Sequence, residues 1–431
     1  MKKRILVVCL LISIVASLFS GCGTSTDKAA DSSTALSSAT ATSQPAPEPS
    51  KLVLWMPPFG TEDTLDKELW TNVTAPFAKE NNVELQIEIT PWENYEAKYL
   101  TGISSGNGPD VGYMYNEMIY DYINMGALEP LDGMLTAEDK EHFYYLDHGV
   151  INGKSYGMPI VVGNARVLFY NKDILDAKGV QVPKTWEEFR EASKKVTDGK
   201  VYGTVMPWGE AATRALNVAY FPFLWQAGGD LISSDGTKVT FNSEAGIKAL
   251  KFISDLKNVD KSMPDSVTSM SEPDSKGFFL DGKCAFIIQA TSFTKQLDEK
   301  GINWGYITSL TDKTQGTFMA TDMLVMTSSS KNKEMAFKLM KHMLKGESMT
   351  EFHKMSAFAP VAKDEAYNDN PAFESMFEND KAALKTLPVA KQTSKIYDYL
   401  LKNIQLVMMG ELSPEDALKN AEQYSNDLLN N

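Results

Sequence analysis

Phe59, Trp92 and Trp208 each come directly after a proline in a turn-forming stretch of the chain. An aromatic ring beside polar side chains offers a flat apolar face. The C–H face of a sugar ring can stack on such a face while its hydroxyl groups are hydrogen-bonded. Large aromatic residues also fill protein cores, so each of the three is either a stacking platform or a core residue.

Motifs of known catalytic or metal-binding sites are scarce. The segment Gly153-Lys154-Ser155 resembles the end of a phosphate-binding loop, but His148 stands where that loop needs its first glycine. No HExxH occurs, the four histidines show no metal-ligand spacing, and three cysteines are too few for a disulfide framework. We expect no cofactor and no metal. A glycosidase's paired carboxylates are defined only in space, so a secreted carbohydrate-active enzyme stays an alternative.

The N-terminus has the pattern of a lipoprotein signal peptide. Three basic residues in MKKR precede the uncharged run ILVVCLLISIVASLF, and Ser20-Gly21-Cys22 resembles a bacterial lipobox. We therefore expect residues 1–21 to be removed and Cys22 to be lipidated. Residues 22–50 are rich in Ser, Thr, Ala and Pro and lack large apolar side chains, which predicts a disordered tether.

The length and composition indicate a globular protein with more than one lobe. With 431 residues and 43% hydrophobic residues, the chain exceeds what one hydrophobic core normally organises. The formal net charge is −14, which repels the phosphates of nucleic acids. We therefore expect no nucleic-acid partner.

Hydrophobic periodicity predicts an α/β fold. Strands are expected at 51–54, 83–89 and 111–115, separated by helices at 68–79 and 95–104. Strands that alternate with helices at this spacing favour crossover connections and a mainly parallel sheet.

Two further helices have recognisable start signals. Thr185 and Glu188 form a capping-box pattern, which explains Glu187-Glu188 better than a catalytic pair does. Ser413 followed by Pro414 is expected to begin a last amphipathic helix.

Nine segments in order resemble the extracellular solute-binding proteins of carbohydrate ABC importers, of the maltodextrin-binding type. They are KLVLW, SSGNGPDVGYMYNE, YINMGALEPLD, INGKSYGMPI, LFYNKDIL, PKTWEEF, WQAGGDLI, FFLDGKCAFII and SPEDAL. The resemblance implies two α/β lobes joined by a hinge, with the ligand in a cleft between them. It places the first lobe at 51–162 plus 320–366 and the second at 166–318 plus 370–431.

The resemblance also implies a ligand site. Glu117 matches an acidic hydroxyl-binding position, and Met114 replaces a stacking tryptophan, so that Tyr113 or Tyr115 must compensate. Phe293 and Tyr397 match stacking aromatics. The complete set of expected ligand contacts is Phe59, Trp92, Tyr115, Asn116, Glu117, Asn164, Arg166, Trp208, Phe293, Asp322 and Tyr397.

The implied function is that of a receptor without catalysis. The resemblance predicts a monomer, lipid-anchored on the outer face of the bacterial cytoplasmic membrane, that binds a sugar or oligosaccharide and delivers it to the membrane permease of an ABC importer. A same-fold receptor for another solute, such as a polyamine, a metal or glycerol phosphate, is the alternative.

Overall fold

A computed structural model describes residues 49–59, 63–233, 236–354, 358–365, 373, 375–376 and 379–430. These residues belong to one compact unit that begins at Glu48. The predicted signal peptide, Cys22 and nearly all of the predicted tether lie outside the described residues.

A five-stranded sheet carries what we call the first lobe. Its strand order is β2-β1-β3-β12-β6, made of β1 (Ser50–Met56), β2 (Val83–Ile89), β3 (Val111–Met114), β6 (Gly157–Gly163) and β12 (Ala320–Met326). The three strands expected near the start of the chain are all present. β1 is parallel to both β2 and β3, whereas β12 is antiparallel to β3 and β6.

A four-stranded sheet carries the second lobe, in the order β10-β7-β9-β8. Its strands are β7 (Arg166–Asn171), β8 (Tyr202–Val205), β9 (Cys284–Ala290) and β10 (Trp304–Ile307). β7 is antiparallel to β9 and β10, and only β8 and β9 are parallel. Both sheets are thus mixed: the expected parallel arrangement is confirmed for β1, β2 and β3 but does not extend to the whole of either sheet. The reason is that some strands are reached directly from the other sheet, without a crossover helix.

Two short connections lead into or out of the first-lobe sheet. Asn164 and Ala165 lead from β6 to β7, and Met319 leads from β11 (Thr317–Phe318) to β12. Asn164 has the left-handed φ of +45°, which asparagine tolerates better than most residues. Strand β11 pairs with β13 (Leu384–Lys385), and a hairpin pairs β4 (Val150–Ile151) with β5 (Lys154–Ser155). The predicted lobe boundaries stay predictions.

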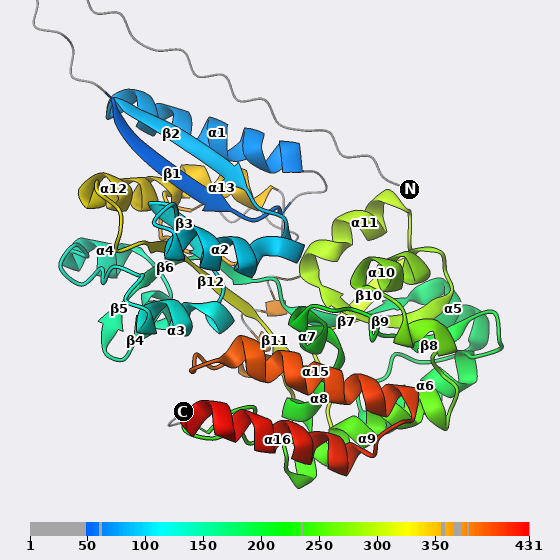
Figure 1. Cartoon of the computed structure of the whole chain (residues 1–431). Coiled ribbons are helices and arrows are strands. Elements are labelled where there is room, and N and C mark those ends of the chain that lie inside the picture. The colour runs from blue at the N-terminus through cyan, green and yellow to red at the C-terminus, as the bar shows by residue number, and fades with distance from the viewer. Residues whose placement is uncertain are drawn as a thin grey trace, which may run out of the picture. The chain divides into compact units, whose positions relative to one another are not determined.

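Helices cover both sheets (Figure 1). α1 contacts β2, α12 and α13, while α15 packs against α16 and both contact α9. The helices are α1 (Asp63–Glu80), α2 (Tyr95–Ser104), α3 (Asn116–Asn124), α4 (Ala137–His142), α5 (Lys172–Lys178), α6 (Trp186–Val196), α7 (Leu216–Ala219), α8 (Phe221–Gln226), α9 (Glu244–Asn258), α10 (Glu272–Leu280), α11 (Thr294–Glu299), α12 (Lys333–Met343), α13 (Gly346–His353), α15 (Thr393–Met409) and α16 (Pro414–Asn430).

The expected helix starts are confirmed. Thr185 and Glu188 form the capping box of α6, with the Glu188 amide 3.2 Å from the threonine hydroxyl. The Ser413 hydroxyl accepts from the Asp416 amide at 3.1 Å before α16.

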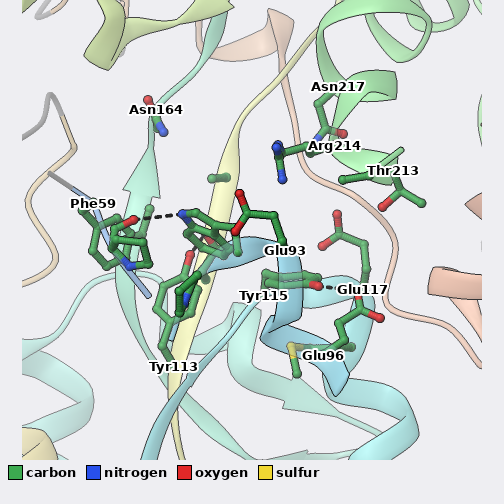
Figure 2. Close-up of a pocket in the computed structure, with 18 of the residues that line it drawn as sticks. Phe59, Glu93, Glu96, Tyr113, Tyr115, Glu117, Asn164, Thr213, Arg214 and Asn217 are labelled. Atoms are coloured by element: carbon green, nitrogen blue, oxygen red, sulfur yellow. Dashed lines mark hydrogen bonds between the residues drawn. The ribbon is translucent and has the colours of Figure 1, made fainter. Parts of the chain in front are cut away.

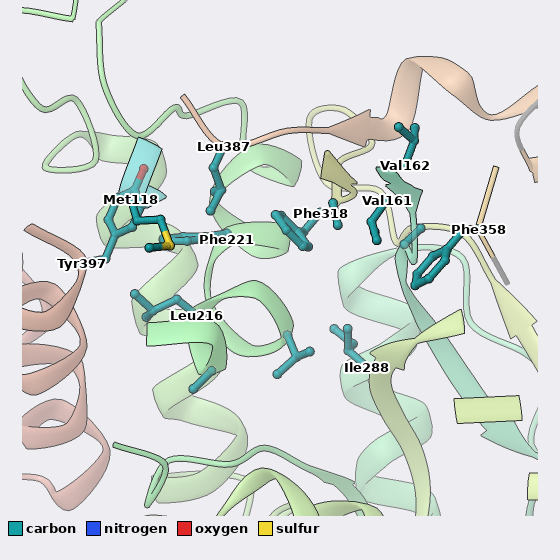
Figure 3. Close-up of a cluster of buried hydrophobic side chains, with 14 of the residues drawn as sticks. Met118, Val161, Val162, Leu216, Phe221, Ile288, Phe318, Phe358, Leu387 and Tyr397 are labelled. Atoms are coloured by element: carbon teal, nitrogen blue, oxygen red, sulfur yellow. The ribbon is translucent and has the colours of Figure 1, made fainter. Parts of the chain in front are cut away.

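One hydrophobic cluster runs through both lobes. Near the connections, Met118 of α3 lies beside Tyr397 of α15, and α3 and α15 are in contact (Figure 3). Val161 of β6, Phe318 of β11 and Phe358 belong to the same cluster. This packing holds in place the elements whose side chains line a cavity between the two sheets.

Candidate functional site

A cavity of about 1950 Å³ is lined by residues of both lobes (Figure 2). Phe59 follows the end of β1, Trp92 follows β2 and Tyr115 follows β3. Because the carboxyl ends of parallel strands meet at one sheet edge, these three aromatic residues converge there. The second-lobe side is formed largely by α7 with the turn before it, α10 and the start of α15.

Four aromatic rings form a connected group on the first-lobe side. The Phe59 ring centroid lies 6.2 Å from that of Trp92 and 5.4 Å from that of Tyr113, and Trp92 lies 6.4 Å from Tyr115. The Trp92 indole donates to the Pro58 carbonyl at 2.9 Å, which holds its ring in place. Tyr113 is buried, whereas Phe59, Trp92 and Tyr115 are only partly covered.

Two carboxyl groups beside these rings have raised pKa values. Burial and the charge of Asp322 raise the pKa of Glu117 to about 8, and burial raises the pKa of Asp322 to about 7. The Tyr113 hydroxyl donates to Asp322, and the Tyr115 hydroxyl donates to Glu96. Burial deprives the Glu117 and Asp322 carboxyl groups of hydrogen bonds to water. Hydroxyl groups of a ligand that donate to them would replace those hydrogen bonds.

Arg166 enters the cavity from the first residue of β7, next to the connection between the sheets. Its Nη1 donates to the Asn164 carbonyl at 2.5 Å, and its guanidinium lies 5.2 Å from the centre of the Phe318 ring. Burial lowers the pKa of Arg166, and the charges of Glu272 and Asp322 act against this. The Asn164 side-chain oxygen accepts from the Ser292 amide at 3.4 Å.

A charged network lines the second-lobe side. Arg214 Nε lies 3.2 Å from Glu272 Oε2, and Arg214 Nη2 lies 3.3 Å from Glu210 Oε2. Lys276 forms a further ion pair with Glu272 at 2.8 Å. Burial alone would raise the pKa of Glu272, but Lys276, Arg166 and Arg214 lower it to about 2.

The two sides of the cavity differ in charge. Among the described residues that line it, the first-lobe side carries acidic side chains and no lysine or arginine: Glu68, Glu93, Glu96, Glu117, Asp121 and Asp322. The second-lobe side carries the basic residues Arg166, Arg214, Lys276, Lys295, Lys391 and Lys395, together with Glu210, Glu272 and Asp398. Opposite charges therefore face each other across the cavity.

Seven of the expected ligand contacts line the cavity: Phe59, Trp92, Tyr115, Glu117, Asn164, Arg166 and Asp322. Asn116 begins α3, but its side chain is outside the described part of the structure.

The other three expected contacts lie in the packed interior and do not line the cavity. Trp208, Phe293 and Tyr397 are 1%, 2% and 1% exposed. The ring centroid of Phe293 lies 6.0 Å from that of Phe169, and the ring centroid of Tyr397 lies 5.1 Å from that of Phe221. The Trp208 backbone carbonyl accepts from Gln405 at 2.9 Å, and the buried indole nitrogen of Trp208 has no hydrogen-bond partner among the described residues. Neighbouring aromatic residues cover Phe293 and Tyr397 in the described structure, which favours a packing role for these two side chains, and a ligand contact by any of the three stays a prediction.

Several cavity residues were missed by the sequence analysis, including Glu93, Glu96, Arg214, Asn217 and Glu272. Glu93 and Glu96 had a usable signal, since they follow the turn aromatic Trp92 by one and four residues. The others lie on elements brought to the cavity only by tertiary packing.

Other chemistry finds no support in the described residues. The segment 102–106, GISSG, matches the pattern of a nucleophile elbow, but Ser104 ends helix α2 and does not line the cavity. No group of three potential metal ligands occurs in the described ranges. Cys284 is buried, which raises the pKa of its thiol. None of the helices in the described part of the chain is long and apolar enough to cross a membrane.

Comparison with known proteins shows one family. Residues 72–383 match the bacterial extracellular solute-binding protein family. A putative binding protein of Brucella abortus is 29% identical over 370 residues, covering 83% of this chain and 89% of that protein. The galactooligosaccharide-binding protein of Bacillus subtilis is 24% identical over 387 residues, covering 87% of this chain and 88% of its own length.

Solved structures show the same two-lobed fold. An ABC transporter solute-binding protein from Thermotoga lettingae bound with α-D-tagatose has a TM-score of 0.77 at 24% identity, covering 88% of this chain and 100% of that chain. An ABC substrate-binding protein from Listeria monocytogenes in complex with cycloalternan has a TM-score of 0.77 at 23% identity, covering 89% of this chain and 100% of that chain.

Proposed function

Because the chain belongs to the bacterial extracellular solute-binding proteins, we propose that it binds a sugar or oligosaccharide in its cavity and delivers it to an ABC importer. The observation that carries this proposal is the juxtaposition of aromatic faces and carboxyl groups at one sheet edge. Trp92 and Tyr115 are partly covered rings, and Glu117 and Asp322 stand beside them in the same cavity.

The proposed contacts divide by chemistry. Phe59, Trp92 and Tyr115 supply apolar faces for sugar C–H groups. Glu117 and Asp322 exchange hydrogen bonds with hydroxyl groups, as acceptor or donor according to their protonation state. Arg166 and Asn164 contact the ligand at the connection between the lobes, and Asn116 remains a predicted contact.

The size of the cavity favours an oligosaccharide over a single sugar. Its volume of about 1950 Å³ exceeds the roughly 300–1,000 Å³ that suits a drug-sized molecule. One relative is named for galacto-oligosaccharides and one structural neighbour holds cycloalternan, whereas another neighbour holds the single sugar α-D-tagatose, so it is the cavity volume that favours an oligosaccharide here.

The membrane attachment is part of the proposal. A lipid on Cys22 and the predicted tether of 22–50 would hold the domain at the outer face of the membrane, near a permease. Mass spectrometry of the membrane fraction tests this idea. A mature N-terminus other than Cys22 would contradict it.

Calorimetry on a panel of sugars tests the ligand class. We expect saturable, reversible binding of at least one di- or trisaccharide built from glucose, galactose, arabinose or N-acetylglucosamine. The same incubations are assayed for new reducing ends, and we expect none because the proposed receptor has no catalytic activity. The proposal would be overturned if the protein bound a polyamine, a metal or glycerol phosphate and bound no sugar of the panel.

A further inference from the structure

Asn217 is a buried polar residue on the cavity wall whose side-chain oxygen has no protein partner in the described structure. It lies in α7 on the second-lobe side and is only 5% exposed. Its Oδ1 atom is buried and accepts no hydrogen bond from the described residues. Burying a carbonyl oxygen without a donor lowers the stability of the folded protein.

Local packing does not explain why this residue is an asparagine. Its neighbours in α7 are the buried apolar residues Leu216, Val218 and Ala219. Leucine has nearly the same shape as asparagine and would fill the position without leaving a polar atom unpaired. Because Asn217 lines the cavity, a ligand bound there is a natural partner for its carboxamide.

Arg214 accompanies Asn217 on the same wall. Residues three apart on helical turns face the same side, and Figure 2 shows Arg214 and Asn217 on the side of the pocket opposite Tyr115 and Glu117. Arg214 is held by its bonds to Glu210 and Glu272. The Glu210 carboxylate also accepts a hydrogen bond from the backbone amide of Glu272 at 3.1 Å. A guanidinium has five N–H groups, so donors remain after these two bonds.

We propose that Asn217 is a specificity-determining contact of the second lobe: rotation of its carboxamide brings Oδ1 from its buried position to the cavity, where it accepts a hydrogen bond from a hydroxyl group of the bound sugar, and Arg214 donates to another oxygen of the same ligand. The inference rests on the proposed function and names a recognition group for it. A hydroxyl fits better than an ammonium group, because the positive charge of Arg214 would repel a cation.

The test is Asn217→Leu, measured with the best-binding saccharide of the panel described above. We expect the dissociation constant to rise about ten-fold or more, because the sugar hydroxyl loses its acceptor in a water-excluded site. The melting temperature without sugar should stay the same or rise, because the variant no longer buries an unpaired carbonyl. A purely structural asparagine would show a lower melting temperature and unchanged affinity, and that result would overturn the inference.

Ser193→Ala is the matched control. The Ser193 hydroxyl is also buried without a partner in the described structure, but Ser193 lies in α6 and does not line the cavity. Its removal should leave the affinity unchanged. Equal weakening by both variants would refute a specific role for Asn217.

Mono-deoxy derivatives of the same saccharide give a second, independent measurement. The derivative that lacks the hydroxyl bound by Asn217 should bind the wild-type protein more weakly than the parent saccharide does. Asn217→Ala should bind that derivative and the parent saccharide almost equally, because the variant has already lost the acceptor. Wild-type binding with no such coupling overturns this inference and leaves the proposed function standing. Absence of wild-type binding to every sugar instead overturns the proposed function and this inference with it.

Discussion

At the scale of single residues, the cavity separates aromatic side chains that offer a face from those that fill the interior. Trp92 is held at its edge by the Pro58 carbonyl, with part of its ring uncovered. Tyr397 is buried, and its hydroxyl has no partner in the described residues. The two residues therefore make opposite predictions for the same kind of substitution.

Trp92→Ala should weaken sugar binding by about 5- to 150-fold, which corresponds to roughly 1–3 kcal/mol for the loss of an aromatic anchor. Tyr397→Ala is the contrast: it should cost roughly 3–5 kcal/mol of stability, as for other buried aromatic residues, while the folded fraction keeps its affinity. Calorimetry and thermal melts on both variants check this. A Tyr397 variant that melts normally but binds weakly would restore the original expectation that Tyr397 stacks on the ligand.

Glu117 and Asp322 should make the stability of the sugar-free protein fall as pH rises. Their folded-state pKa values, about 8 and about 7, lie above the ordinary values of 4.5 and 3.8. The folded state therefore binds protons more tightly than the unfolded state, and this stabilisation is present at low pH and lost as pH rises toward 8. Thermal melts between pH 5.5 and 8 measure it.

Glu117→Gln provides the control for that titration. Glutamine imitates the protonated carboxyl, so the variant should melt above the wild type at pH 8 and close to it at pH 5.5. An identical difference at both pH values would show that Glu117 does not titrate in this range.

At the scale of elements, glycines reveal where helices touch the rest of the fold. Gly246 and Gly277 both lie within helices, α9 and α10. A Cβ atom at Gly246 would lie 1.8 Å from the Phe241 carbonyl oxygen, whereas a Cβ at Gly277 would meet nothing within 4 Å. The same substitution is therefore expected to have opposite effects.

Gly246→Ala should destabilise the protein by about 1–3 kcal/mol or more, because the obstructing atom is backbone and cannot rotate away. Gly277→Ala should stabilise it by roughly 0.5–1 kcal/mol, since alanine loses less conformational freedom on folding. Denaturant unfolding of the two variants measures both changes. If Gly246→Ala left the free energy of unfolding unchanged, α9 would not be packed as closely against the Phe241 carbonyl as the structure indicates.

At the scale of the whole folded unit, the charge difference across the cavity adds to the effect of a ligand that touches both lobes. Such a ligand favours the arrangement in which the lobes approach each other, by its differential affinity for that state. Approach of the acidic side to the basic side is favourable as well, and salt screens that attraction.

Sugar binding should therefore reduce the radius of gyration, and the affinity for a neutral saccharide should fall by a factor of about three or more between roughly 50 mM and 1 M NaCl. Small-angle scattering and calorimetry measure the two effects. Replacing Lys391 and Lys395 by glutamine should flatten the salt dependence. An unchanged radius of gyration at saturation would instead indicate a rigid pocket.

The sequence by itself determined the features that depend on neighbouring residues. The α/β class, the early strands and the capping box at Thr185 follow from local periodicity and from hydrogen bonds across three residues, and the structure contains them. For turn aromatics such as Trp92, the sequence left open whether the ring is a stacking platform or a core residue.

Only the tertiary structure decided which side chains face the cavity. Trp208 and Trp92 both follow a proline, yet one is buried and the other lines the cavity, because burial depends on what packs from distant segments. The mixed sheets arise from strands that return through the connections between lobes, and Asn217 reaches the cavity through the packing of α7. Contacts between residues a hundred or more positions apart leave no periodic trace in a single sequence.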